Sequence, residues 1–119
     1  MIKPLSELVA EARQHCQSID IEEALQQIDT KPSPLLVDVR EPGETQNHSV
    51  KGAINIPRGV LEMKMAALCH DPDQPILIYC ATGGRASLSA VALQKMGYRN
   101  VKVIQGDCEL IANSMNRDL

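Results

Sequence analysis

Residues 76–85 read Ile-Leu-Ile-Tyr-Cys-Ala-Thr-Gly-Gly-Arg, and this stretch decides how the chain is interpreted. Its first four residues form an apolar run that is typical of a strand buried on both faces of a parallel sheet. Cys80 and a glycine-rich turn follow, and Arg85 opens a stretch with helical spacing of apolar residues. Parallel sheets bind ligands outside the carboxyl ends of their strands, so the turn after this strand is the first candidate for a functional site.

Short apolar runs and helical patterns alternate on both sides of this stretch. Further strands are expected at residues 16–20, 35–39, 53–56 and 101–104, and helices at residues 5–15, 21–28, 59–68, 85–96 and 106–115. The alternation predicts an α/β fold with an open, mostly parallel sheet of four to five strands and helices on both faces. The length of 119 residues fits a single domain.

Composition excludes several functional classes. Aromatic residues are only 2% of the chain, so the core must be aliphatic and no stacking surface for single-stranded nucleic acid is expected. The net charge is -3 and no basic run occurs, so a nucleic-acid partner is not expected. No apolar run is long enough to span a membrane, and the charged N-terminal residues do not resemble a signal peptide. We therefore expect a cytoplasmic protein without a membrane partner.

Four cysteines occur, at positions 16, 69, 80 and 108. Their even number is compatible with disulfides, but the wide spacing and the absence of a secretory signal favour reduced thiols. Cys16 and Cys69 lie on apolar faces and are expected in the core. No cysteine pair or cysteine–histidine cluster has zinc-ligand spacing, so no metal is expected.

Each residue type in the turn after residue 79 has a chemical use. A cysteine at a helix N-terminus faces aligned N–H groups, which favour a negatively charged sulfur. Glycines let successive N–H groups converge on one anion, and Arg85 adds a bidentate cationic donor. The pattern predicts a nucleophilic thiolate, Cys80, in an anion-binding cradle. The alternative is a buried cysteine beside an ordinary glycine turn, but the conjunction of strand, cysteine, turn, arginine and amphipathic helix favours a functional site.

The chain resembles the single-domain rhodaneses, which are sulfurtransferases. The matching segments are LLVDVREPGE (35–44), GAINIPRGVLE (52–62), ILIYCATGGRASLSAVALQKMGYRNV (76–101) and the VKVIQG that follows. The resemblance covers about residues 17–106 and keeps the motifs in family order. It implies a rhodanese-like domain at 16–119, preceded by an N-terminal helical extension at 1–15.

The resemblance implies a mechanism. Cys80 would take the sulfane sulfur of thiosulfate or another persulfide-type donor and pass it to cyanide or a thiol, including a protein thiol. Substrate would be bound by a loop of Ala81, Thr82, Gly83, Gly84 and Arg85, with Arg58 at its mouth. Asp38 and Arg40 would support the loop. No metal and no organic cofactor are implied.

Alternatives remain open for several of these roles. Asp38 and Arg40 could simply form ion pairs at a strand end, and Arg58 could be a solvated arginine. The domain could also act as a protein-binding or sulfur-carrier module with little turnover. Related phosphatases have a longer loop between cysteine and arginine, so the four residues here favour sulfur over a tetrahedral oxyanion.

The chain departs from the family pattern at three places. Ser49 stands where the family has histidine, and Asp107 replaces the second glycine after the last strand. A downstream tryptophan is missing, so Leu110 or Ile111 would have to fill its space. Cys108 follows the last strand and is a candidate relay thiol near the mouth of the site.

Overall fold

The computed structural model describes residues 1–116, and its centre is a parallel sheet of five strands. The strands are β1 (Gln17–Ile19), β2 (Leu35–Asp38), β3 (Ile54–Asn55), β4 (Ile76–Tyr79) and β5 (Val101–Ile104), in the spatial order β1-β5-β4-β2-β3. All four neighbouring pairs are parallel, with Val37 opposite both Ile54 and Ile78. This confirms the predicted α/β fold with a parallel sheet, and the three residues beyond 116 of the expected domain at 16–119 lie outside the described part.

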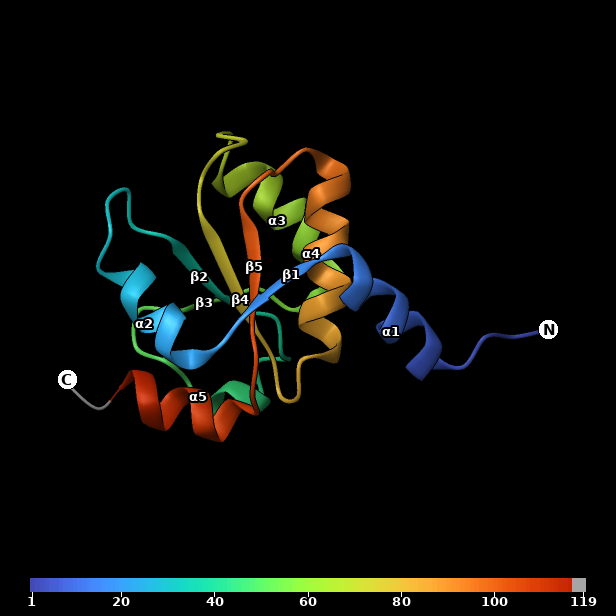
Figure 1. The fold of residues 1–119 in the computed structure, drawn as a ribbon, viewed down its shortest axis with the longest axis horizontal. Helices are drawn as coiled ribbons and strands as arrows, with labels where there is room; N and C mark the ends of the chain where they lie inside the picture. The colour runs from blue at the N-terminus through green and yellow to red at the C-terminus, as the bar shows by residue number, and fades with distance from the viewer. Residues whose placement is uncertain (117–119) are drawn as a thin grey trace.

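Helices cover both faces of the sheet (Figure 1). The helices are α1 (Leu5–His15), α2 (Ile21–Ile28), α3 (Leu61–Leu68), α4 (Gly84–Met96) and α5 (Cys108–Met115). Short 3₁₀ turns lie at Glu44–Gln46 and Arg58–Val60. One apolar cluster joins α3 and α4 to the sheet, and another joins α2 and α5 to the opposite face.

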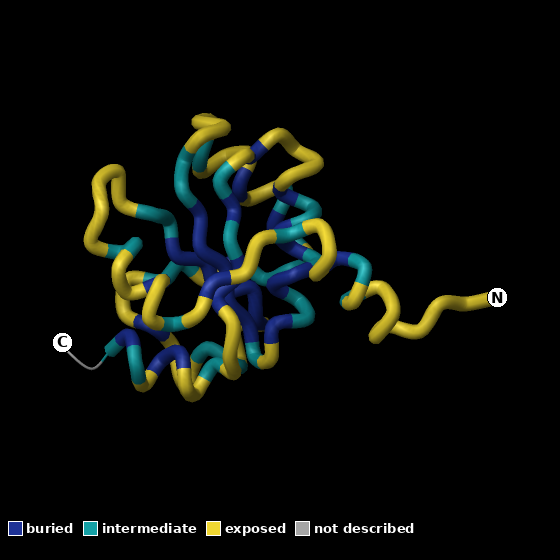
Figure 2. Tube along the Cα trace, viewed as in Figure 1, coloured by how far each residue is buried: buried dark blue, intermediate teal, exposed yellow. Residues whose placement is uncertain are grey.

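Alternate residues of each inner strand enter opposite clusters, as the pleat of a strand requires. In β4, Ile76 and Ile78 face α3 and α4, whereas Leu77 and Tyr79 face α2 and α5. All four are buried, and Figure 2 shows the inner strands as the buried centre of the molecule. The all-apolar sequence of β4 therefore follows from burial on both faces.

The observed elements differ from the expected ones mainly at their ends. The strand expected at 53–56 is reduced to Ile54–Asn55, because Pro57 cannot donate to a strand ladder. The helix expected from 106 begins at Cys108, because the Asp107 side chain accepts a hydrogen bond from the Leu110 N–H and caps it. Gly106 precedes this cap at a φ of 120°, a left-handed conformation that glycine adopts without strain.

Helix α1 packs on α4 and extends away from the sheet (Figures 1 and 2). The Val9 side chain lies 3.6 Å from the position that a Cβ atom on Gly84 would occupy. Arg13 Nη2 lies 3.5 Å from the corresponding position on Gly83. The helix therefore lies directly against the turn that follows Cys80.

No helix within the described residues has the length and apolar character needed to cross a membrane.

Candidate active site

The polar site residues gather where the order of the sheet reverses. From β4 the chain proceeds to β5 on one side, whereas β2 proceeds to β3 on the other. Cys80 follows β4, and Asp38 and Arg40 lie at the end of the adjacent strand β2. Such a reversal leaves a crevice at the carboxyl edge of a parallel sheet, the usual position for a ligand.

Cys80 lies beneath the first turn of α4. Its Sγ accepts hydrogen bonds from the Gly83 N–H at 3.0 Å and the Ala86 N–H at 3.3 Å. Gly83 has a φ of 99°, and this left-handed conformation turns the chain back over the sulfur. Two N–H dipoles and the start of a helix therefore converge on one sulfur atom, which favours negative charge there. Cys80 is only 1% exposed, so this interaction takes place away from bulk water.

The turn itself is anchored by its carbonyl groups. The Gly83 carbonyl accepts from both the N–H and the hydroxyl of Ser87, at 3.0 and 2.8 Å. The Ala81 carbonyl accepts from the Cys108 N–H at 3.0 Å, which ties the turn to α5. With these carbonyls engaged, the turn can present N–H groups to an anion.

Arg85 is brought to the same edge, and both of its Nη nitrogens are paired with a carboxylate. Its Nη1 and Nη2 atoms donate to the two carboxylate oxygens of Glu44, at 2.7 and 2.9 Å. Glu44 Oε2 also accepts from the Glu41 N–H at 2.9 Å. The hydrogen bonds from Arg85 lower the pKa of Glu44 to about 2. The pKa of Arg85 is raised, chiefly by Glu44 and further by Cys80.

Asp38 and Arg40 form a buried pair with each other. Both side chains are nearly inaccessible to solvent, at 2% and 3% exposure, and Arg40 Nη2 lies 2.8 Å from Asp38 Oδ2. Arg40 Nε donates to both carboxylate oxygens as well. The hydrogen bonds to Asp38 raise the pKa of Arg40 above its usual range, so it stays charged.

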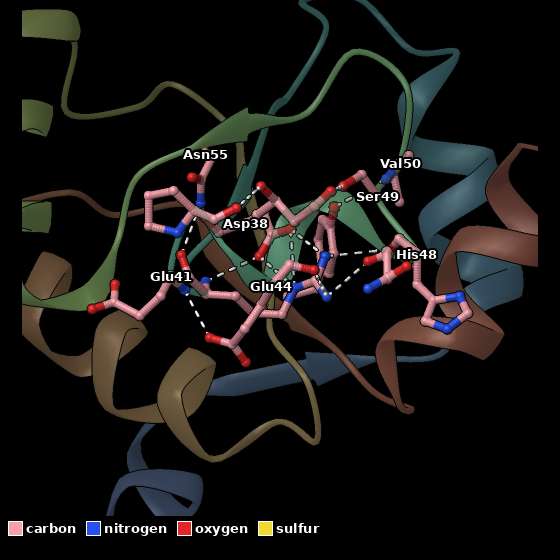
Figure 3. Close-up of polar contacts among 12 residues, drawn as sticks. Asp38, Glu41, Glu44, His48, Ser49, Val50 and Asn55 are labelled. Carbon is pink, nitrogen blue, oxygen red and sulfur yellow. Dashed lines mark hydrogen bonds and ion pairs between the residues drawn. The ribbon is translucent and has the colours of Figure 1, made fainter.

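Arg40 uses its remaining donors to hold the loop that carries Glu44. Nη1 donates to the carbonyl oxygens of Glu44 and Asn47 at 3.2 and 3.1 Å, and Nη2 donates to that of His48 at 3.4 Å. Figure 3 shows these loop residues gathered around the end of β2. The arginine also lies over the Tyr79 ring, with Cζ 5.9 Å from the ring centre. It therefore fixes the loop from inside.

Two further side chains complete this polar cluster. Asn55 donates from Nδ2 to the carbonyl oxygens of Asp38 and Arg40, at 3.0 and 2.9 Å (Figure 3). The Tyr79 hydroxyl accepts from the Val50 N–H at 3.1 Å, and burial raises the pKa of Tyr79 to about 12. No role was predicted for Asn55, Tyr79 or Glu44. Tyr79 ends the predicted strand at 76–79, Asn55 lies within the one at 53–56, and Glu44 lies in the loop after the one at 35–39.

Arg58 forms an ion pair with a residue close to it in sequence. Its Nη1 atom lies 2.8 Å from Glu62 Oε1, one turn further along the chain. The two residues line a groove that α1 and α4 also border. Arg58 therefore pairs with Glu62 beside this groove, and its position at the mouth of the Cys80 loop stays a prediction.

A polar pocket of about 510 Å³ adjoins the turn on the side of α1. Thr82 and Gly83 form part of its wall, together with Arg13 and Cys16 from the end of α1. Cys16 is half-buried rather than fully in the core, and burial raises the pKa of its thiol. All four cysteines are free thiols.

The departures from the family pattern have visible structural roles. The Ser49 hydroxyl donates to the Thr45 carbonyl, and the Ser49 carbonyl accepts from Asn116, the residue after α5, at 2.8 Å. Ile111 is fully buried, whereas Leu110 is 54% exposed, so Ile111 is the residue that fills the core at this point. Cys108 is half-buried beside the Cys80 turn.

Among residues 1–116, no three side chains of histidine, cysteine, aspartate or glutamate are grouped so as to hold a metal ion.

This protein is a parallel α/β domain. Its central strand ends at a cysteine whose sulfur is held by backbone N–H groups, and these two features define its class. The chain matches the rhodanese-like domain family over residues 20–114, and it belongs to that family.

Relatives and solved structures agree with this assignment. A sulfurtransferase of Allochromatium vinosum is 30% identical over 88 residues, which are 74% of this chain and 80% of that protein. The thiosulfate sulfurtransferase PspE of Escherichia coli is 33% identical over 66 residues, 56% of this chain and 64% of that protein. The solution structure of a polysulfide-sulfur transferase homodimer from Wolinella succinogenes has a TM-score of 0.71 at 27% identity, covering 85% of this chain and 76% of that one.

Proposed function

We propose that this protein is a sulfurtransferase that carries sulfane sulfur on Cys80. The observation that carries the proposal is the pair of N–H groups, from Gly83 and Ala86, directed at the Cys80 sulfur. Such donors stabilise an anionic sulfur much as an oxyanion hole stabilises oxygen. Family membership supports sulfur transfer as the general reaction. The domain at residues 16–119 would carry this function, and residues 1–15 would be an extension to it.

Thiosulfate is the donor that we propose. In the first step the Cys80 thiolate attacks the outer sulfur of thiosulfate, a new S–S bond forms, and the old S–S bond breaks. Sulfite leaves with the electron pair, and Cys80 becomes a persulfide anion. The name of the Escherichia coli relative supports this choice.

In the second step an acceptor removes the sulfur. Cyanide or a thiolate attacks the terminal sulfur of the persulfide, and the bond to Cys80 breaks. Thiocyanate or a new persulfide leaves, and the Cys80 thiolate is regenerated, so the charges balance over the cycle. The residues of the turn, from Ala81 to Arg85, would hold the anionic groups in both steps, and no metal or organic cofactor is needed.

Asp38 and Arg40 would support this site indirectly. Arg40 holds the loop of residues 44–48, and that loop places Glu44 against Arg85. Arg58 would act on substrate only after leaving Glu62, so we assign it a smaller role than the turn.

The test combines turnover with mass measurement. Wild-type protein should produce thiocyanate from thiosulfate and cyanide, and incubation with thiosulfate alone should add the mass of one sulfur atom. Cys80→Ser should lose both signals, because the hydroxyl does not replace the thiolate nucleophile. Cys69→Ser is the matched control, because Cys69 lies at the end of α3 at the opposite edge of the sheet.

Equal inactivity of wild type and Cys80→Ser would contradict the enzymatic proposal. Sulfur bound to Cys80 without turnover would instead support the alternative of a sulfur-carrier or protein-binding module.

A further inference from the structure

The anion-binding face of Arg85 is filled by a carboxylate of the same chain. Both Nη atoms donate to Glu44, so the fork that these two nitrogens form at the end of the guanidinium is used. A guanidinium fork binds one carboxylate or one edge of an oxyanion in this way at a time. An anion that uses the same fork must therefore replace Glu44.

The pair is placed where such an exchange can occur. The side chains of Arg85 and Glu44 are 36% and 39% exposed, so water reaches both groups. Exposed pairs of this kind contribute little net free energy, because each partner can be solvated when they separate. The neighbouring Asp38–Arg40 pair cannot separate in this way, because it is enclosed by protein and water does not reach its charges.

Glu44 is held in position by contacts that do not involve Arg85. The Glu41 N–H donates to its Oε2 atom, and Arg40 holds its main-chain carbonyl. The loop therefore keeps its shape when the contact to Arg85 opens, and the carboxylate stays nearby to close it again. An internal competitor of this kind acts at a high effective concentration.

We propose that Glu44 occupies the anion-binding donors of Arg85 until an anionic sulfur donor displaces it, and thereby sets which anions bind beside Cys80. The proposal rests on the proposed function only in naming the donor, thiosulfate. A dianion competes well with one internal carboxylate. Monocarboxylates, which differ little from Glu44 itself, compete poorly at ordinary concentrations.

Binding rather than turnover provides the direct test. Thiosulfate is titrated into Cys80→Ser protein, which cannot take up the sulfur, and the dissociation constant is measured by NMR. Adding Glu44→Gln should tighten thiosulfate binding by about 3- to 10-fold, because the competing charge is gone. It should also let acetate compete with thiosulfate at lower concentration.

Two controls separate displacement from a general change in charge. Glu41→Gln removes a negative charge from the same loop, and the Glu41 side chain makes no recorded bond to Arg85. It should change the dissociation constant by less than about 2-fold, because exposed charges are screened. Arg85→Gln added to Glu44→Gln should abolish the gain.

The outcomes decide the proposal independently of the enzymatic one. Unchanged or weaker thiosulfate binding in Glu44→Gln would overturn it, as would no binding in any variant, an equal gain from Glu41→Gln, or a gain that survives Arg85→Gln. Tighter binding with no thiocyanate formation by the wild type would support the displacement and contradict the sulfurtransferase proposal.

Discussion

Two arginine–carboxylate pairs lie at the same edge of the sheet, and their surroundings differ completely. Asp38–Arg40 is enclosed, and every recorded donor of Arg40 ends on an oxygen of the protein. Glu44–Arg85 is more than a third exposed on both sides. The buried pair fixes the shape of the site, whereas the exposed pair can open. The reason is that an unpaired charge is costly when it is buried and costs little when water reaches it.

The largest effect is expected from breaking the enclosed pair. Asp38→Asn leaves the charge of Arg40 buried without a counter-charge, and we expect the free energy of unfolding to fall by about 3–5 kcal/mol. Urea denaturation measures it. Asp73→Asn is the control, because its pair with Arg99 is exposed and should contribute far less to the free energy of unfolding. Equal losses in the two variants would show that enclosure is not what matters.

A smaller effect is expected from keeping the charge but removing the fork. Arg40→Lys retains a cation beside Asp38 but cannot reach the carbonyl oxygens of Glu44, Asn47 and His48 together. We expect a loss of about 1–3 kcal/mol in the free energy of unfolding, with faster amide hydrogen exchange in residues 44–48. Unchanged exchange there would mean that the loop does not depend on Arg40.

The smallest effect concerns the exposed pair and its pH dependence. The folded pKa of Glu44 is about 2, below its ordinary 4.5, so the stability it contributes is present above pH 4.5 and is lost as pH falls through 2. The wild type should exceed Glu44→Gln by about 1 kcal/mol or less between pH 5 and pH 8, since exposure weakens the pair. Denaturant titrations from pH 2 to pH 8 measure this difference, which should shrink toward zero as pH falls from 4.5 to 2. A difference that grows toward acid would contradict the assignment.

Much of the fold could be predicted because the local sequence patterns favour the same elements that burial in the core stabilises. The run at 76–79 is apolar throughout and is buried on both faces, and Gly97 ends α4 in a left-handed conformation. Helix ends were less predictable where a side chain decides them. Asp107 begins α5 two residues later than expected because its carboxylate accepts the Leu110 N–H.

The site was predictable where its residues are neighbours in sequence and less so where they are not. Cys80 and Gly83 lie three residues apart, and the strand-to-helix turn brings them together. Glu44 meets Arg85 across 41 positions, and only the loop held by Arg40 determines that contact. The sequence predicts Arg58 at the mouth of the loop, and it did not reveal that Glu62, one turn away, would accept a hydrogen bond from the Arg58 Nη1 atom.

Helix α1 has a practical consequence for protein engineering. The residues before this helix project from the body (Figure 1), and Ile2 among them is 93% exposed. Val9 and Arg13 of the helix lie against Gly84 and Gly83. A reporter or purification tag fused before residue 1 would thus be separated from the turn after Cys80 by residues 1–8, which include the first turn of α1. Deleting residues 9–13 would remove the Val9 and Arg13 side chains that lie against this turn. Libraries built on this scaffold should therefore vary the first four positions freely and leave 9–13 unchanged.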